Sequence, residues 1–92
     1  MLPAEAVLVI PRGVRLHRDA VRDRWVLLAP ERTIALDEVA HAVLSEIDGR
    51  SSFGEIVSRL AARYGAPEAQ VSADAGDYVS GLIDRRILEL RP

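Results

Sequence analysis

The chain has 92 residues, with twelve basic and fourteen acidic side chains, a net charge of −2 and a hydrophobic fraction of 49%. This length fits one domain with a small core, so residues 1–92 are predicted to form a single domain. Cysteine and lysine do not occur. Disulfides, thiolate zinc sites, cysteine nucleophiles, Schiff-base lysines and P-loop lysines are therefore excluded.

The first ten residues are apolar but carry Glu5 and lack a basic start. They are too few to span a bilayer, so they indicate neither a signal peptide nor a membrane segment. We expect a soluble cytoplasmic protein with no membrane partner. Residues 1–10 are expected to be flexible or exchanged between copies of the chain.

Three short strands are predicted in the first third of the chain. Residues 14–16 form the first, and the polar residues 17–24 form a loop. Residues 25–28 are apolar and include an aromatic and a β-branched residue, and residues 33–36 follow a proline-containing turn. The predicted sheet therefore has three strands, with Trp25 assigned to the core.

The hydrophobic period then changes from that of a strand to that of a helix. Asp37 opens the first helix, which is predicted to end at Asp48-Gly49. Ser52 and Glu55 have the spacing of a capping box, so a second helix begins there and ends near Gly65. Apolar residues at helical spacing predict the faces of these two helices that are buried: Val39, Val43, Leu44, Ile47, Phe53, Ile56, Val57, Leu60 and Tyr64.

A third helix is predicted from residue 67 or 68 to residue 85. One apolar stripe runs along it from Val71 to Ile83, and Asp74, Asp77 and Asp84 lie on the opposite face. Residues 87–90 are predicted to close the chain as an extended segment. The predicted fold class is α+β and winged-helix-like, with a small three-stranded antiparallel sheet followed by three helices.

Motifs for catalysis or metal binding are not apparent. The two histidines, His17 and His41, have no third ligand at metal spacing, and no glycine-rich phosphate loop occurs. The chain is therefore expected not to be an enzyme and to hold no cofactor and no metal. Binding is the function class that remains.

A winged-helix shape makes a DNA-binding regulator the alternative hypothesis. In that case the third helix would enter the major groove and should be basic. Its exposed face is predicted to be acidic instead, which disfavours nucleic acid as the partner. Peptide binding at the edge of the strand formed by residues 33–36 is the other possibility. The same edge could equally be kept short so that nothing pairs with it.

Three segments in order resemble the PqqD family, the small peptide chaperones of pyrroloquinoline quinone biosynthesis. They are "RWVLLAPERTIAL", "AHAVLSEIDGRSSFGEIVSRLAARYGAP" and "VSADAGDYVSGLIDRRIL". The resemblance covers residues 11–90, and it lies in the order of the segments rather than in a single motif. It implies a RiPP recognition element, which is a winged-helix-like peptide-binding domain without catalysis.

The family further implies two partners. These are the precursor peptide PqqA and the radical S-adenosylmethionine enzyme PqqE, which joins a Glu and a Tyr side chain of that peptide. The peptide is expected as an added antiparallel strand on the third strand, in the groove beside the third helix. Apart from the resemblance, the small core and the free strand edge predict a homodimer when no peptide is present.

Carried over to this chain, the resemblance predicts a peptide-binding groove with two walls. Alternation places Ile34 and Leu36 on one face of the strand, and Thr33 and Ala35 on the other. Arg85 and Arg86 either pair with acidic peptide side chains or cap the helix. The predicted groove residues are Thr33, Ile34, Ala35, Leu36, Tyr78, Leu82, Arg85 and Arg86.

Overall fold

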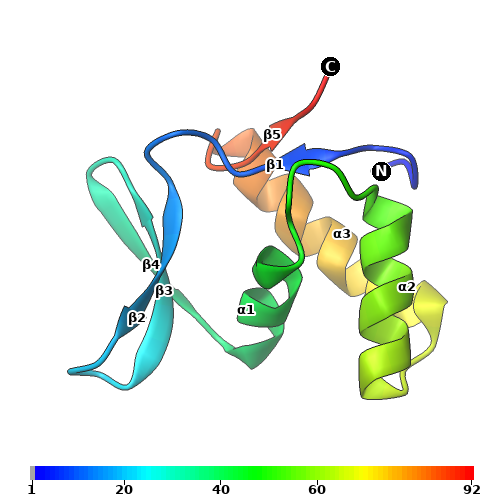
Figure 1. Cartoon of the computed structure of the whole chain (residues 1–92), viewed down its shortest axis with the longest axis horizontal. Coiled ribbons are helices and arrows are strands. Elements are labelled where there is room, and N and C mark those ends of the chain that lie inside the picture. Colours follow the sequence, from blue (N-terminus) through cyan, green and yellow to red (C-terminus); the bar gives the residue numbers. More distant parts are fainter. Residues whose placement is uncertain (1) are drawn as a thin grey trace.

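The computed structural model describes residues 2–92, and these residues form short strands and three helices (Figure 1). The elements, in chain order, are β1 (Leu8–Val9), β2 (Arg15–Asp19), β3 (Arg24–Ala29), β4 (Arg32–Leu36), α1 (Glu38–Ser45), α2 (Phe53–Tyr64), α3 (Glu68–Asp84) and β5 (Glu89–Leu90). A three-stranded antiparallel sheet precedes the three helices. The predicted α+β, winged-helix-like fold class is confirmed.

The sheet has the order β2-β3-β4, so β3 is central and β4 forms one edge. The register pairs Trp25 with Leu36 and Ala29 with Arg32. The prediction of a loop over residues 17–24 was wrong in part, because β2 continues to Asp19 and pairs His17 with Val26. Polar residues tolerate strand geometry there because β2 is largely exposed to solvent.

A second, two-stranded sheet joins the two ends of the chain. β1 pairs with β5, and Leu8 is fully buried beneath the pair. The Phe53 N–H donates to the carbonyl of Ala6 at 2.7 Å, and the Arg91 N–H donates to that of Val7 at 2.8 Å. Residues 2–10 therefore lie against the body of their own chain in this structure. Of the extended segment predicted at residues 87–90, only Glu89–Leu90 form a strand, β5, and residues 87 and 88 lie in a bend.

The helix starts agree with the signals in the sequence. The Asp37 carboxylate accepts the Ala40 N–H at 2.7 Å and caps α1. Ser52 and Glu55 form a complete capping box at the start of α2. Gly65 ends α2 with a φ of 62°, a conformation that glycine adopts without steric cost.

The end of α1 differs from the prediction. The helix stops at Ser45, about one turn before Asp48. The Asp48 carboxylate accepts the N–H groups of Arg50 and Ser51 at 2.9 and 2.7 Å, and the Ser51 hydroxyl at 3.0 Å. This side chain organises a turn between α1 and α2, which competes with continuation of the helix.

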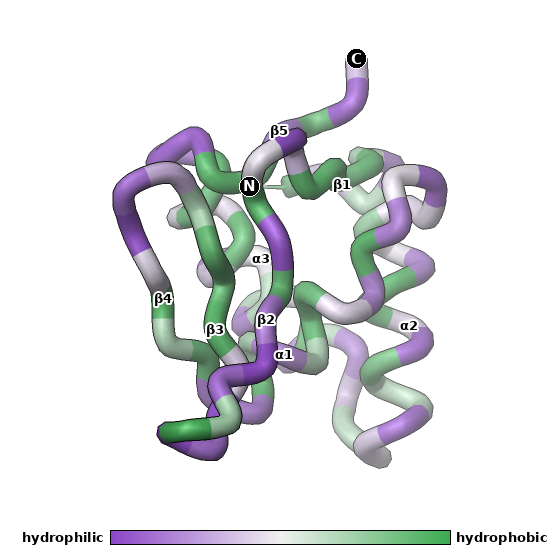
Figure 2. The backbone as a smooth tube through the Cα atoms, turned by 60° about the vertical axis from the view of Figure 1, so that its left-hand side comes forward, coloured by the Kyte–Doolittle hydropathy of each residue, from purple (hydrophilic) through white to green (hydrophobic). Residues whose placement is uncertain are grey.

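One hydrophobic core lies between the sheet and the helices. In Figure 2 the tube is green along β3 and purple at the turn joining β3 to β4, in keeping with buried and exposed positions. Side chains of at most 1% exposure come from both sheets and all three helices: Leu8, Leu27, Leu44, Ile56, Val79 and Leu88.

Three side chains expected in the core are at the surface. Trp25 is 36% exposed because its ring stacks on His41 of α1 instead of entering the core. Val39 is 66% exposed and Tyr64 is 55% exposed. These two residues lie at the start of α1 and the end of α2, where no further element covers the two helices.

Candidate functional site

The outer edge of β4 is open. β4 pairs with β3 on one side only, and no backbone hydrogen bond reaches its other side from the rest of residues 2–92. Ala29 and Arg32 flank a two-residue turn. The two residues that flank such a turn form a hydrogen-bonded pair, in which each N–H donates to the C=O of the other residue. Because bonding alternates along an antiparallel pair, Thr33 and Ala35 direct their N–H and C=O groups outward.

The side chains of β4 follow the predicted alternation. Ile34 and Leu36 face the core, where Leu36 is 7% exposed and Ile34 is partly buried. Thr33 and Ala35 are exposed on the other face. The backbone of β4 is therefore available to a partner, together with two small uncharged side chains.

The second edge of the sheet, β2, offers a different surface. It presents Arg15, Arg18 and Asp19, and two of these form ion pairs, Arg18 with Asp23 and Asp19 with Arg22. Charged side chains along an edge oppose the addition of a strand. β4 is the better receiving edge.

α3 carries Tyr78, the first residue predicted for the second wall. Tyr78 is partly buried, and its hydroxyl has no hydrogen-bond partner among the described residues. Burial raises the pKa of Tyr78, and the nearby negative charge of Asp37 raises it further. Asp37 connects β4 to α1, and α1 packs against both β4 and α3.

The other predicted residues of α3 divide into buried and exposed ones. Leu82 is 2% exposed and belongs to the core, so it presents almost no side-chain surface to a partner. Arg85 and Arg86 are exposed at the end of the helix. Arg85 and Arg86 therefore lie at the surface of the protein, and Leu82 does not.

A cavity of about 200 Å³ lies where the start of β4 meets the end of α3. Arg32, Arg85 and Arg86 line this arginine pocket, together with Pro30 and three apolar residues. No acidic side chain lines it, and none of the three arginines forms an ion pair within residues 2–92. Clustered, unpaired guanidinium groups of this kind suit a carboxylate ligand.

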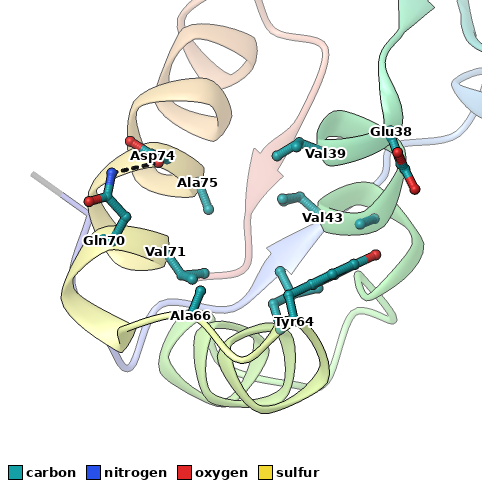
Figure 3. A pocket seen from close by; sticks show the side chains of 11 residues that line it. Glu38, Val39, Val43, Tyr64, Ala66, Gln70, Val71, Asp74 and Ala75 are labelled. Atoms are coloured by element: carbon teal, nitrogen blue, oxygen red, sulfur yellow. Dashed lines mark hydrogen bonds between the residues drawn. The ribbon is translucent and has the colours of Figure 1, made fainter.

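A second, mostly apolar cavity of about 360 Å³ lies between the three helices (Figure 3). Val39 and Val43 of α1 point toward Val71 of α3, and the ring of Tyr64 lies along the lower side. Glu38 and Asp74 stand at its rim. Sequence analysis missed this apolar pocket because Val39 and Tyr64 were assigned to the core.

Other functional groups are scarce in the described part of the chain. Residues 2–92 contain no group of three His, Asp or Glu side chains placed to hold a metal ion. They also contain no helix with the length and apolar character needed to cross a membrane. On α3, Asp74, Asp77 and Asp84 are exposed as predicted, and these charges would repel DNA phosphates.

Comparison with known proteins identifies the family. Residues 24–88 match the model of "Coenzyme PQQ synthesis protein D (PqqD)". A Rhizobium meliloti relative named "PqqA binding protein" is 38% identical over 98% of this chain and 92% of its own length. The bifunctional coenzyme PQQ synthesis protein C/D of Methylorubrum extorquens is 48% identical over 87% of this chain, which corresponds to 22% of its own length.

Solved structures show the same relationship. The PqqD part of Methylobacterium extorquens PqqCD, described as a stand-alone RiPP recognition element, is 44% identical with a TM-score of 0.83, over 97% of this chain and 95% of that one. PqqD from Xanthomonas campestris is 38% identical with a TM-score of 0.61, over 88% and 90% of the two chains. The chain belongs to the PqqD family of pyrroloquinoline quinone biosynthesis.

Proposed function

We propose that this protein is a non-catalytic chaperone that binds the precursor peptide PqqA and presents it to the radical enzyme PqqE. The observation that carries the proposal is the open edge of β4 beside α3. Relatives over most of the chain are named for binding PqqA, and a structure at 44% identity is described as a recognition element.

The binding step is strand addition. PqqA pairs with the outward N–H and C=O groups of Thr33 and Ala35 and extends the sheet by one antiparallel strand. Tyr78, Arg85 and Arg86 contact its side chains from α3. Ile34, Leu36 and Leu82 support the groove from the core and act on the peptide through the position of β4 and α3.

The test is to titrate unlabelled synthetic PqqA into isotope-labelled protein and follow the amide resonances. We expect shifts concentrated at residues 33–36 and 78–86. If these resonances stay unchanged at high peptide excess, the proposed site is wrong.

A proline substitution tests the backbone mechanism directly. Ala35→Pro removes one outward N–H, and the edge position keeps the ladder to β3 intact. Ala35→Ser is the matched control because it keeps the N–H and adds only a small exposed group. We expect the first variant to lose PqqA binding while remaining folded, and the second to retain it. Equal binding by the two folded variants would contradict strand addition.

Presentation to PqqE is tested separately. A reconstituted PqqE reaction should form cross-linked PqqA faster when wild-type protein is added than when Ala35→Pro is added. The protein alone, mixed with PqqA and S-adenosylmethionine, should leave the peptide unchanged, because it is proposed to have no catalytic group. Association into a homodimer without peptide stays a prediction, which sedimentation with and without PqqA would check.

A further inference from the structure

The arginine pocket and the apolar pocket are lined by the same two segments, which form the walls of the proposed groove. One wall begins with β4 at Arg32 and continues through Asp37 to Glu38, and the other wall is α3. Arg32 and Arg85 line the arginine pocket, whereas Glu38 and Asp74 line the apolar pocket. The chain therefore runs from the arginine pocket to the apolar pocket along the first wall, and from the apolar pocket to the arginine pocket along α3.

The dimensions of the walls agree. An extended chain from Arg32 to Glu38 covers roughly 20 Å at about 3.3 Å per residue. The helical rise from Asp74 to Arg85 covers about 16 Å at roughly 1.5 Å per residue. Tyr78 lies on α3 between Asp74 and Arg85, and α3 packs against α1, the helix that β4 leads into. A peptide added to β4 would pass Tyr78 and reach both pockets.

The groove has opposite charges at its two ends. The arginine pocket has three guanidinium groups and no acidic group in its lining. The apolar pocket has two carboxylates, Glu38 and Asp74, and no basic side chain in its lining. The nearby Arg63 does not neutralise this end, because it pairs with Glu46 at 2.6 Å.

The apolar pocket also has the character of a side-chain receptor. Val39, Val43 and Val71 supply its surface, and Figure 3 shows them converging on a common space next to the ring of Tyr64. Its volume of about 360 Å³ is large enough for one bulky aromatic or aliphatic side chain. A basic neighbour of that side chain would meet Glu38 at one side of the rim or Asp74, which also accepts from Gln70 at 3.0 Å, at the other.

We propose that the groove selects a peptide segment in which a bulky apolar residue, next to a basic residue, precedes an acidic residue by about six positions. This inference rests on the proposed strand addition. An antiparallel strand on β4 has its N-terminal end at Glu38 and its C-terminal end at Arg32. The apolar residue then occupies the apolar pocket, and the carboxylate binds Arg32, Arg85 and Arg86.

Two capped octapeptides of identical composition test the order of these side chains. The first is Lys-Trp-Thr-Val-Thr-Val-Thr-Asp, and the second has the same residues in the reverse order. Affinities are measured by titrating each peptide into isotope-labelled protein, with synthetic PqqA as the reference ligand. We expect the first peptide to bind at least tenfold more tightly than the second.

Substitutions in both partners assign the two ends. Replacing Trp with Ala in the first peptide should reduce the shifts at Val39 and Val71, and replacing Asp with Asn should reduce those at Arg32 and Arg86. The protein variant Arg85→Glu/Arg86→Glu should lose the preference between the two peptides. Arg50→Glu/Arg91→Glu changes the net charge equally at positions outside both pockets, so it should keep the preference.

The outcomes separate this inference from the proposed function. If PqqA binds at β4 but the two octapeptides bind equally, or neither binds at millimolar concentration, the side-chain order is wrong and strand addition stands. If PqqA itself leaves β4 unperturbed, the proposed strand-addition site is wrong, and this inference fails with it. Loss of preference in the Arg50→Glu/Arg91→Glu control would show that net charge alone, and not the arginine pocket, causes it.

Discussion

Trp25 of β3 and His41 of α1 stack with their ring centroids 4.3 Å apart and their planes inclined by 15°. Trp25 pairs across the hairpin with Leu36, the last residue of β4. The stack therefore connects the sheet to α1 at the point where β4 leads into the helix. It holds one end of the open edge in place.

A double-mutant cycle measures this connection. Aromatic pairs of this geometry contribute roughly 0.5–1.5 kcal/mol beyond the area they bury. We expect Trp25→Ala and His41→Ala to show a coupling free energy of that size in urea unfolding. As a control, Val21→Ala changes a side chain that is 93% exposed. Its effect on the free energy of unfolding should be additive with that of Trp25→Ala. Independent effects of Trp25 and His41 would mean that the stack does not stabilise the fold.

The turn before β4 is strained at one residue. Glu31 follows Pro30 and has a φ of 60°, a conformation typical of glycine in a type II turn. Glu31→Gly should raise the free energy of unfolding by about 0.5–1 kcal/mol, because the left-handed conformation disfavours residues with a Cβ. Glu31→Ala keeps the Cβ and removes only the carboxylate, so it should show no such gain in urea unfolding. Equal effects of the two substitutions would rule out strain as the cause.

The Asp48 turn gives the protein an acid-dependent stability. N–H groups of Ser51 and Arg50, and the Ser51 hydroxyl, lower the pKa of Asp48 from 3.8 to about 2. Because the folded-state pKa is the lower one, this contribution is present above pH 3.8 and is lost as the pH falls toward 2. Asp48→Asn should therefore be less stable than wild type at pH 5, and the difference should shrink by pH 2.5.

Melting temperatures at pH 5, 4, 3 and 2.5 check this expectation. Asp84→Asn is the control, because Asp84 is exposed and makes no side-chain hydrogen bond within residues 2–92. The difference in melting temperature between Asp84→Asn and wild type should not shrink as the pH falls. A constant difference between Asp48→Asn and wild type across this range would show that ionisation of Asp48 is not involved.

The features predicted correctly from the sequence are local ones. Asp37, Ser52 and Gly65 mark helix ends because a cap needs only its nearest neighbours along the chain. The alternation of Ile34 and Leu36 with Thr33 and Ala35 follows from strand geometry alone.

The features that were missed depend on how elements pack. Val39 and Tyr64 have the spacing of core residues, yet no element covers them, and periodicity along one helix does not contain that information. Trp25 is apolar enough for the core, but His41 of another element provides a contact at the surface. The arginine pocket likewise joins Arg32 to Arg85 and Arg86, which are far apart in the sequence.

Tyr78 also predicts a loss of stability at alkaline pH. Its folded-state pKa is raised above the usual tyrosine value of 10.0, first by burial and then by the negative charge of Asp37. The unfolded chain therefore releases this proton at a lower pH than the folded protein, and stability is lost as the pH rises above 10. Tyr78→Phe should reduce this loss in urea unfolding at pH 9 and 11. Tyr64→Phe changes an exposed side chain and should not reduce this loss of stability.

Finally, Tyr78→Phe should separate stability from binding. The hydroxyl of Tyr78 is buried without a partner among residues 2–92, which costs roughly 1–3 kcal/mol for a fully buried group. Because the side chain is only partly buried, we expect Tyr78→Phe to be more stable than wild type by about 1 kcal/mol at pH 7.

If the bound peptide supplies the missing partner, the same substitution should weaken PqqA binding by roughly tenfold, since a hydrogen bond to a buried group is lost. Urea unfolding and PqqA titration of the same sample measure both effects. A variant that is stabilised but binds PqqA like wild type would place the peptide away from Tyr78, whereas a destabilised variant would show that the hydroxyl already has a partner in the free protein.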